Sequence, residues 1–427
     1  MTALVRTASS PEHATRKLHI GFVHTHPIQY FAPLYAELNQ TNDLAITALY
    51  LSDYSIRGAI DGGFGRPVKW DIDLLHGYQA RFVEGAEKRD EVTGFFSMIA
   101  PGTWREVQGG AFDAIVVHGH TPAAMLLAAA AAKQSGIPVF LRCETHLGLR
   151  RSKFKTALRR LLIGRYYRLF DGVLAIGSAN RRFHRAMGIP ESRIFMMPYA
   201  VDNKRFSSAS RLTDAERLHQ RAELGLGDDR PLILYAAKLQ RRKRPDDLLR
   251  AAARLNADRI AFHLVLVGSG EMEAELRRLA DELGVPNIRF AGFVNQAALP
   301  RIYGAADVFV LPSEDEPWGL AVNEAMCAGL PVIASRKIGC VPDLVHDGLN
   351  GRTFPAGDVG ALTDALREVL VDDSRRRNMG HASRALIENW SYAECAAGLR
   401  AALGSIAVRQ STAGAFPRQL PASDRFN

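Results

Sequence analysis

Cysteine is scarce in this sequence, with four residues in a chain of 427. Their spacing matches neither a metal site nor a disulfide framework, and they stand at Cys143, Cys327, Cys340 and Cys395. This argues against a structural zinc site and against a small secreted scaffold that depends on disulfides. We therefore expect a protein of a reducing cytosol.

A long apolar run is also missing. The longest one, residues 123–132, falls well short of the ~20 residues that a membrane-spanning helix needs. Thr121 and Pro122 suit the N-cap and the first position of an ordinary helix, so we expect a soluble helix here. Residues 1–16 hold no apolar stretch long enough for a signal peptide, and a cytoplasmic protein is the expectation.

Length and composition indicate two globular domains. The chain is longer than one typical domain of ~100–200 residues, and its 47% hydrophobic and 23% charged residues are ordinary for a globular protein. Residues 1–16 and 405–427 show no helical or strand periodicity, and the latter are rich in Ser, Ala, Pro, Arg and Gln. Both ends are expected to be disordered tails.

Short apolar runs alternate with helical patterns, which is typical of parallel sheets built from βαβ units. The runs expected to be strands are residues 18–23, 45–51, 114–118, 139–143, 172–177, 232–237, 262–268, 288–293, 308–312 and 332–335. They predict two doubly wound halves that join near residues 197–205. Because ligands of open α/β sheets bind at the carboxyl ends of the strands, two facing halves would hold substrates between them.

The segment of residues 311–332, LPSEDEPWGLAVNEAMCAGLPV, places two glutamates around the expected change from strand to helix. Glu316 precedes the helix and Glu324 lies within it. The free N–H groups around Gly319 and Leu320, with the positive end of the helix dipole, favour a phosphate or a developing oxyanion. The two carboxylates could accept hydrogen bonds from sugar hydroxyls, so this layout suits a bound phosphorylated sugar.

The run EPWGLAVNEAMCAGLPV resembles the donor-site signature of the retaining GT-B glycosyltransferases of family four, E-x-F-G-x-x-x-x-E-A followed by G-x-P-V, with Trp318 in place of Phe. The resemblance implies an α/β fold of two Rossmann-like domains facing across a cleft. Residues 17–203 would form the acceptor domain and residues 204–390 the nucleotide-sugar donor domain. Residues 391–404 would form a helix that packs back on the N-terminal domain, and the tail would follow from 405.

A second landmark of this family, G-R-L-x-x-x-K-G, resembles the segment that follows the strand at residues 232–237. Lys238 stands where the family has Arg, and Lys243 matches its Lys. The resemblance implies that both cations bind the donor diphosphate, although a lysine is a point charge without the bidentate fork of arginine. Arg244 replaces the last Gly of the element.

Two further segments extend the resemblance over about residues 230–392. NIRFAGFV resembles the part that meets the nucleobase, which points to Phe293 and Val294. IGCVPDLVHDGLNG resembles the loop that ends the donor site, with Asp343 where the family more often has Glu.

The N-terminal half resembles the family less closely. The family's Gly-rich loop after the first strand is missing, and residues 26–30 take its place, which leaves open whether this loop contacts the diphosphate. FDAIVVHGHT resembles the strand end that carries the family's functional histidine, so His118 is implied to lie beside the reacting sugar. His120 competes for that role, and a purely structural histidine is the alternative. Glu144 or His146 could face the acceptor.

Charge is unevenly distributed, with a net charge of +9. Residues 150–168 contain eight Lys or Arg and no acid, with apolar residues at helical spacing. Such a helix suits an anionic membrane surface, where a lipid-linked acceptor would reside, and a solvated surface helix is the alternative. No nucleic-acid-binding module accompanies the charge.

The resemblance implies transfer of a sugar from a nucleoside-diphosphate sugar to a hydroxyl acceptor in cell-surface glycan synthesis, without a cofactor or metal. Glu316 would orient the sugar and stabilise its positive ring, and Glu324 would hold the ribose. Asp71 and Asp73 spell the D-x-D of manganese-dependent glycosyltransferases, but three residues match easily by chance. The alternatives are a sugar-nucleotide epimerase and a non-catalytic partner subunit. Gly268-Ser-Gly270 lacks the third glycine expected of an NAD oxidoreductase.

Overall fold

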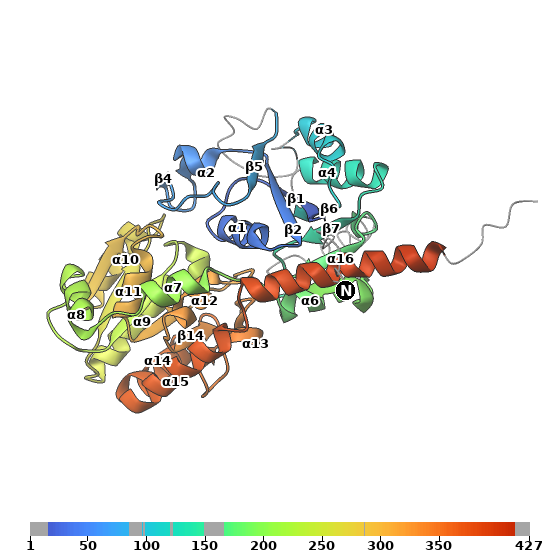
Figure 1. Ribbon diagram of the computed structural model, residues 1–427. Helices are drawn as coiled ribbons and strands as arrows, with labels where there is room; N and C mark the ends of the chain where they lie inside the picture. Colours follow the sequence, from blue (N-terminus) through green and yellow to red (C-terminus); the bar gives the residue numbers. More distant parts are fainter. Residues whose placement is uncertain are drawn as a thin grey trace, which may run out of the picture.

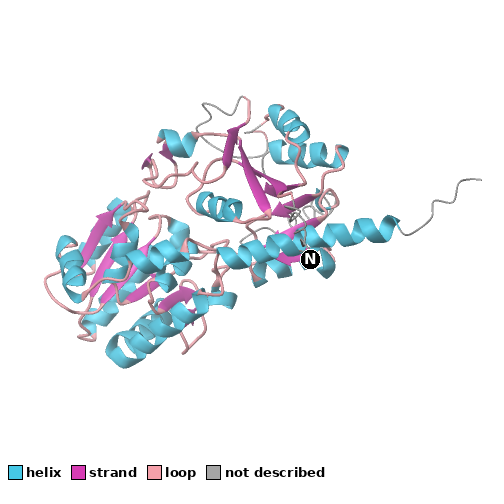
Figure 2. Ribbon diagram, in the orientation of Figure 1, coloured by secondary structure: helices cyan, strands magenta, loops and turns pink. Residues whose placement is uncertain are grey.

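The computed structural model describes residues 16–84, 96, 99–119, 123–148, 166–285 and 287–414. Within them, two all-parallel sheets form two domains, which confirms the predicted pair of doubly wound halves. Figure 1 shows the domains side by side, and Figure 2 shows helices flanking each sheet. Residues 1–15 of the predicted N-terminal tail, His120 and nearly all of the basic segment 150–168 lie outside the described residues.

The N-terminal domain contains a seven-stranded sheet with the strand order β5-β2-β1-β6-β7-β8-β9. Its strands are β1 Leu18–His24, β2 Leu44–Tyr50, β5 Gln79–Phe82, β6 Ala114–His118, β7 Val139–Arg142, β8 Gly172–Ala175 and β9 Ile194–Met196. Its helices are α1 Ala32–Gln40, α2 Tyr54–Arg57, α3 Gly102–Gly109, α4 Ala123–Gln134, α6 Ser178–Ala186 and the 3-10 turn η1 Glu191–Arg193. A separate hairpin pairs β3 Ile60–Asp61 with β4 Arg66–Pro67.

The C-terminal domain contains a six-stranded sheet with the strand order β12-β11-β10-β13-β14-β15. Its strands are β10 Leu232–Ala236, β11 His263–Val267, β12 Ile288–Gly292, β13 Val308–Leu311, β14 Val332–Ser335 and β15 Gly351–Phe354. Its helical elements are α7 Asn203–Ala209, α8 Asp214–Glu223, η2 Arg241–Lys243, α9 Pro245–Ala257, α10 Glu273–Glu282, α11 Leu299–Ala305, α12 Leu320–Cys327, α13 Val341–Leu344, α14 Val359–Val371 and α15 Asp373–Ile387.

The central strands are buried on both faces, which explains their continuous apolar runs. Strand order reverses between β1 and β6 in one sheet and between β10 and β13 in the other. At such a switch point the loops at the carboxyl ends diverge and leave a crevice for a ligand. The loops after β10 and β13 carry Lys238 and Glu316, so the fold brings the predicted donor-site segments together.

The C-terminal helix α16 Tyr392–Gly414 packs against β8, β9 and α1 of the N-terminal domain. Arg400 on this helix forms an ion pair with Asp43, with Nε 2.6 Å from Oδ2. The prediction of a tail from residue 405 is wrong as far as Gly414, because the helix continues there. Residues 405–414 contain no proline, so no residue there removes a backbone donor from the helix that the preceding residues have begun.

The core of the N-terminal domain continues into that of the C-terminal domain through aromatic rings. Tyr199 and Trp318 stack with ring centroids 6.2 Å apart, and Trp318 lies 5.3 Å from Trp390. The two domains therefore share one apolar contact beside the cleft. None of the described helices combines the length and apolar character that crossing a membrane requires.

Candidate functional site

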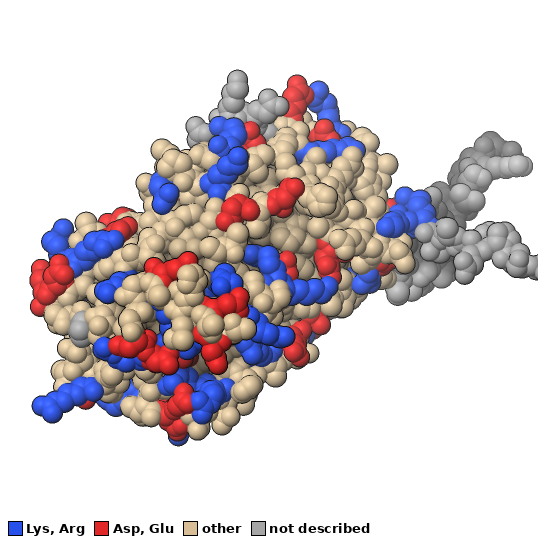
Figure 3. Space-filling view, turned by 60° about the vertical axis from the view of Figure 1, so that its left-hand side comes forward, with Lys and Arg blue, Asp and Glu red and all other residues tan. Residues whose placement is uncertain are grey.

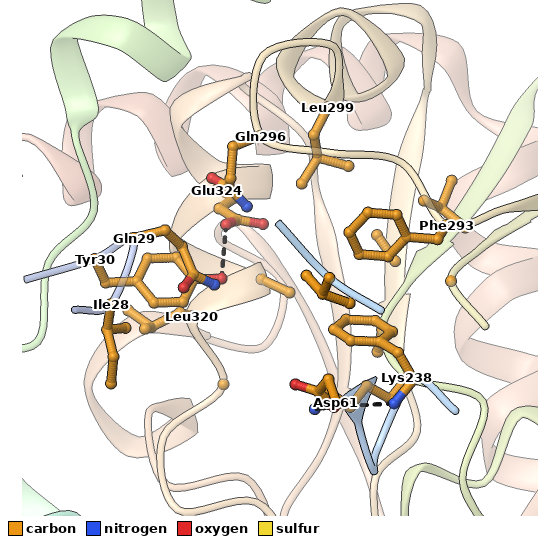
Figure 4. Close-up of a pocket in the computed structure, with 18 of the residues that line it drawn as sticks. Ile28, Gln29, Tyr30, Asp61, Lys238, Phe293, Gln296, Leu299, Leu320 and Glu324 are labelled. Carbon is orange, nitrogen blue, oxygen red and sulfur yellow. Dashed lines mark hydrogen bonds and ion pairs between the residues drawn. The ribbon is translucent and has the colours of Figure 1, made fainter. Parts of the chain in front are cut away.

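A cavity of about 430 Å³ lies between the two domains at the carboxyl ends of the C-terminal strands. The predicted site residues that line it are Glu144, Lys238, Lys243, Phe293, Val294, Glu316, Gly319, Leu320 and Glu324. Figure 4 shows part of this lining, with Phe293 and Lys238 on one side and Glu324 and Tyr30 on the other. Residues that are far apart in the sequence thus meet in one pocket.

The turn between β13 and α12 places Glu316 and Gly319 in the pocket wall. Gly319 has φ of 100°, and a side chain there would bring a Cβ to 2.8 Å from Ile338 Cγ2, so glycine is required on both counts. Helix α12 begins at Leu320, directly after this turn. The first amides of the helix are therefore close to the cavity and suited to an anion.

Glu316 is held by cations and by the backbone. Its Oε2 forms a close ion pair with Lys243 Nζ and lies 3.8 Å from Arg242 Nη1. Its carbonyl oxygen accepts a hydrogen bond from Gly339 N at 3.0 Å and lies 3.1 Å from His146 Nε2. His146 belongs to a neighbouring cavity, so of the two acceptor-side candidates Glu144 alone lines the main pocket.

Lys238 and Lys243 lie on the same side of the pocket but differ in their partners. Lys243 is almost buried, and burial lowers its pKa to about 7, with the charges of Arg242 and Lys238 adding to the effect. Lys238 Nζ is 2.7 Å from Asp61 Oδ1 of the N-terminal hairpin. Burial would raise the pKa of Asp61, but the hydrogen bond and charge of Lys238 outweigh it and lower that pKa. Asp61 is therefore ionised near neutral pH.

Arg244 adopts a left-handed conformation with φ of 51°. This is the position at which the resembling family has glycine, so the backbone keeps a glycine-type turn although the side chain has changed. The guanidinium of Arg244 pairs with Asp247 and Glu314. These ion pairs lie on the donor side of the site and fix the start of α9.

Glu324 is 2% exposed, and each of its carboxylate oxygens accepts a hydrogen bond from a tyrosine. Tyr303 of its own domain donates to Oε2 at 2.8 Å, and Tyr30 of the N-terminal domain donates to Oε1 at 3.1 Å. Burial raises the pKa of Glu324 to about 7, although both hydrogen bonds oppose the rise. Each oxygen of the predicted ribose acceptor thus already has a hydrogen-bond donor.

The predicted nucleobase wall is aromatic on both sides of the cleft. Phe293 follows β12, and the ring of Phe64 from the β3–β4 hairpin meets it nearly edge-on, with centroids 4.9 Å apart. Trp70 lies 6.1 Å from Phe293, and Arg66 Cζ lies 5.2 Å from its centroid. Flat apolar faces of this kind suit a stacked base.

His118 does not line the pocket, although the sequence placed it beside the reacting sugar. It is 8% exposed, its Nε2 hydrogen-bonds with Tyr35 Oη at 3.1 Å, and its ring lies 4.5 Å from His24 and 4.7 Å from Phe31. Burial, then the charges of His24 and Arg142, lowers the pKa of His118. These rings come from the end of β1, from the residue before α1 and from α1 itself, and they bury the histidine. A direct contact with sugar stays a prediction.

Glu144 follows β7 and accepts a hydrogen bond from Tyr199 Oη at 2.5 Å. Burial raises its pKa, with the tyrosine bond and the charge of Arg142 opposing the rise. Asp343 accepts a hydrogen bond from Ser178 N at 2.8 Å and so ties α13 to the start of α6. A polar contact thus joins the domains on this side too.

Asp71 and Asp73 have structural partners. Asp71 accepts from Ala297 N at 3.0 Å, and Asp73 accepts from Leu75 N at 2.9 Å. The described part of the chain contains no group of three His, Cys, Asp or Glu that could hold a metal ion. Acidic and basic side chains are interspersed on the face of the molecule in Figure 3.

Sequence reasoning missed several residues that line the pocket from the N-terminal domain. They are Asp61, Phe64, Val68 and Trp70, with Tyr54 and Tyr199 beside them, whereas the loop 26–30, which the sequence left open, also lines the pocket. The glycine-rich stretch Gly62-Gly63-Phe64-Gly65 was the available signal, because it marks a tight turn that can approach another backbone closely.

Comparison with known proteins divides the chain along the same boundary. Residues 216–386 match the family described as "Glycosyl transferases group 1", and residues 69–200 match "Glycosyl transferase 4-like domain". Together they match most of both domains.

Curated relatives match about half of the chain. One is a GDP-mannose-dependent monoacylated alpha-(1-6)-phosphatidylinositol monomannoside mannosyltransferase of Corynebacterium glutamicum, 35% identical over 220 residues, which are 50% of this chain and 56% of the relative. Another is a D-inositol 3-phosphate glycosyltransferase of Mycolicibacterium smegmatis, 34% identical over 203 residues, 47% of this chain and 45% of the relative. The chain thus spans about half the length of these relatives.

Among solved structures, Anabaena HepE in complex with UDP has a TM-score of 0.69 and 17% identity, covering 93% of this chain and all of that one. At this identity the similarity establishes the fold, which is GT-B.

Proposed function

The chain belongs to the group 1 glycosyl transferases, and on this premise we propose that it transfers a sugar from a nucleoside-diphosphate sugar to a hydroxyl acceptor, with retention of anomeric configuration. One observation carries the proposal. Two lysines, the start of a helix and two glutamates line the same cavity, with an aromatic wall beside them. Those are the groups that a diphosphate, a sugar with its ribose, and a base require.

The reaction builds negative charge on the departing diphosphate and positive charge on the sugar ring. Lys238, Lys243 and the first amides of α12 would bind the diphosphate more tightly as it leaves than in the ground state, and only that difference accelerates transfer. Glu316 would orient sugar hydroxyls and stabilise the positive ring. A phosphate oxygen of the leaving group would take the acceptor proton.

The lysines would neutralise the diphosphate without a metal ion. Sugar transfer should therefore persist in EDTA, as measured by release of nucleoside diphosphate. Loss of activity in EDTA that added manganese restores would contradict this part of the proposal.

The acceptor would enter from the N-terminal domain past Glu144. The two curated relatives are named for phosphatidylinositol mannoside and inositol phosphate. We therefore propose that the acceptor is a polar hydroxyl compound of cell-surface glycan synthesis that is linked to a lipid. The enzyme would reach it at the cytoplasmic face of a membrane, and the basic segment 150–168 would help to bind that surface.

Ligand-induced stabilisation tests the donor half of the proposal. We expect one of UDP, GDP and ADP, or its sugar conjugate, to raise the melting temperature well above the others, because a ligand at about 100 times its Kd stabilises by about 2.7 kcal/mol. Absence of any shift at millimolar ligand would contradict a nucleotide-sugar donor. Conversion of the winning donor without any acceptor would point instead to a sugar-nucleotide epimerase.

A further inference from the structure

The N-terminal domain supplies partners to two groups of the donor site. Lys238 Nζ pairs with Asp61 Oδ1 at 2.7 Å, and Glu324 Oε1 accepts from Tyr30 Oη at 3.1 Å. Both contacts appear as dashed lines in Figure 4. They bridge the cleft at the points where a diphosphate and a ribose would bind, so the ligand and the N-terminal domain need the same atoms.

The hairpin that carries Asp61 is fastened to the C-terminal domain. Ser269 Oγ donates to the carbonyl oxygen of Phe64 at 3.0 Å, and Asn295 Nδ2 donates to that of Lys69 at 2.8 Å. A Cβ at Gly63 would lie 2.5 Å from Lys238 Nζ, which shows how closely the turn approaches the lysine. Lys238 Nζ also lies 4.4 Å from the centroid of the Phe64 ring.

Asp61 is a fixed negative charge where a diphosphate needs a positive one. Its Oδ1 also accepts from the N–H groups of Gly63 at 2.8 Å and Phe64 at 3.0 Å, so the carboxylate is locked into the turn. A phosphate bound to the same ammonium would lie close to this carboxylate and be repelled by it. Donor binding must therefore break the contact or work against it.

Tyr30 makes the equivalent contact at the other end of the site. Tyr303, from the C-terminal domain, occupies one oxygen of Glu324, and Tyr30 occupies the other. Ribose hydroxyls can compete with the Tyr30 hydroxyl for Oε1, since both are neutral donors to the same buried carboxylate. Tyr30 comes from the loop that replaces the Gly-rich one, so the replacement itself brings a side chain to the ribose position.

We propose that Asp61 and Tyr30 occupy the diphosphate and ribose positions of the donor site until a nucleoside diphosphate displaces both. The inference rests on the proposed function. It assigns the β3–β4 hairpin and the loop before α1 to donor binding. The affinity for donor then reflects an exchange of partners, because Lys238 and Glu324 already contact Asp61 and Tyr30 before the ligand arrives.

Asp61→Asn and Tyr30→Phe separate the two contacts. With UDP and GDP as probes in isothermal titration calorimetry, each variant should bind the preferred nucleotide about three- to tenfold more tightly than wild type, since each removes one competitor. With pyrophosphate, followed by intrinsic tryptophan fluorescence, Asp61→Asn should bind more tightly and Tyr30→Phe should match wild type. Pyrophosphate has no ribose, so the difference assigns each residue to its end of the ligand.

Matched controls are Asp53→Asn and Tyr50→Phe. Asp53 pairs with Arg57, and Tyr50 hydrogen-bonds Tyr78, both within the N-terminal domain. Neither should change nucleotide affinity. Melting temperatures of all variants without ligand show that each one is folded.

The outcomes separate this inference from the proposed function. If wild type binds UDP or GDP and Asp61→Asn and Tyr30→Phe bind equally well or more weakly, the displacement is wrong and the donor site stands. If neither wild type nor any folded variant binds a nucleotide, the proposed function and the displacement are both wrong.

Discussion

The two domains contribute to the pocket in different ways. The C-terminal domain supplies Lys238, Lys243, Glu316 and Glu324, which lie in or next to the connections that follow strands of its sheet. The N-terminal domain supplies Tyr30 and residues of a hairpin that belongs to neither large sheet. Rigid elements can bind the part of the ligand that many donors have in common. Loops on the opposite wall can vary in sequence and conformation.

This contrast predicts that catalysis depends most on the C-terminal wall. Glu316→Ala should lower kcat by two to three orders of magnitude, about 2.7–4 kcal/mol, if Glu316 acts on charge in the transition state. The measurement is sugar transfer at saturating donor. Glu368→Ala, which removes a partner of Arg352 outside the pocket, is the control. Near-normal kcat in a folded Glu316→Ala protein would show that catalysis does not depend on this residue of the C-terminal wall.

Glu324 is the point at which both domains act on one group, and its burial should be costly. Its folded pKa of about 7 exceeds the ordinary pKa of a glutamate, so between about pH 4.5 and pH 7 the folded state binds the extra proton. The stability contributed by that proton is present at low pH and is lost as pH rises through 7.

Glu324→Gln removes this pH dependence. The unliganded variant should be more stable than wild type at pH 8 by at most about 3 kcal/mol, and the difference should shrink toward pH 5. Chemical denaturation at several pH values measures it. The same variant should lose nucleotide affinity, because its amide presents a single acceptor oxygen to the tyrosines and the ribose. A pH-independent difference would mean that the carboxylate is already ionised well below pH 7.

Lys238 carries the main charged contact between the walls, so its removal should affect binding more than turnover. Lys238→Ala should weaken the affinity for a nucleoside diphosphate about tenfold and reduce the salt dependence of binding, because one cation facing the phosphates is lost. Calorimetric titration at two salt concentrations tests this. An equal loss for the free nucleoside would show that Lys238 shapes the pocket and does not bind phosphate.

The same contrast separates what the sequence could predict from what it could not. The C-terminal site lies in a nearly continuous series of motifs, so the local pattern pointed to Glu316 and Gly319 and the family resemblance pointed to Lys243, and all three line the pocket. Asp61 and Lys238 are 177 positions apart, and no periodicity reports such a contact. The short Asp-Gly-Gly-Phe-Gly turn looks like an ordinary loop until the domains are placed together.

The fold was predictable where strands form apolar runs. Strands β5, β9 and β15 were missed because each includes partly exposed positions that interrupt the apolar pattern. The equally short β7, β8, β13 and β14 are buried throughout and were predicted. The extension of α16 to Gly414 was missed because its sequence lacks an amphipathic pattern. Its packing on the N-terminal domain is a tertiary effect that a local reading cannot supply.

Trp318 joins the two walls, and it marks a departure from the Phe of the resembling family. Its Nε1 donates to Asn323 Oδ1 at 2.9 Å, while Asn323 Nδ2 donates to the carbonyl oxygen of Tyr199 at 3.0 Å. Trp318→Phe should cost about 1–2 kcal/mol of stability, because a buried amide oxygen loses its donor. Donor KM and kcat should change little, as measured by steady-state transfer.

Gly177 provides a sharper test of this contact. A Cβ at Gly177 would lie 2.2 Å from Trp318 Cζ3 and 2.6 Å from Cη2, atoms that phenylalanine lacks, and 2.8 Å from Asp343 Oδ2. Gly177→Ala should therefore destabilise wild type more than it destabilises Trp318→Phe, and a double-mutant cycle in urea measures the coupling. Additive effects would mean that position 177 must be glycine because it lies close to Asp343. The polar contact of Asp343, and not Trp318, would then set how closely the two domains approach each other there.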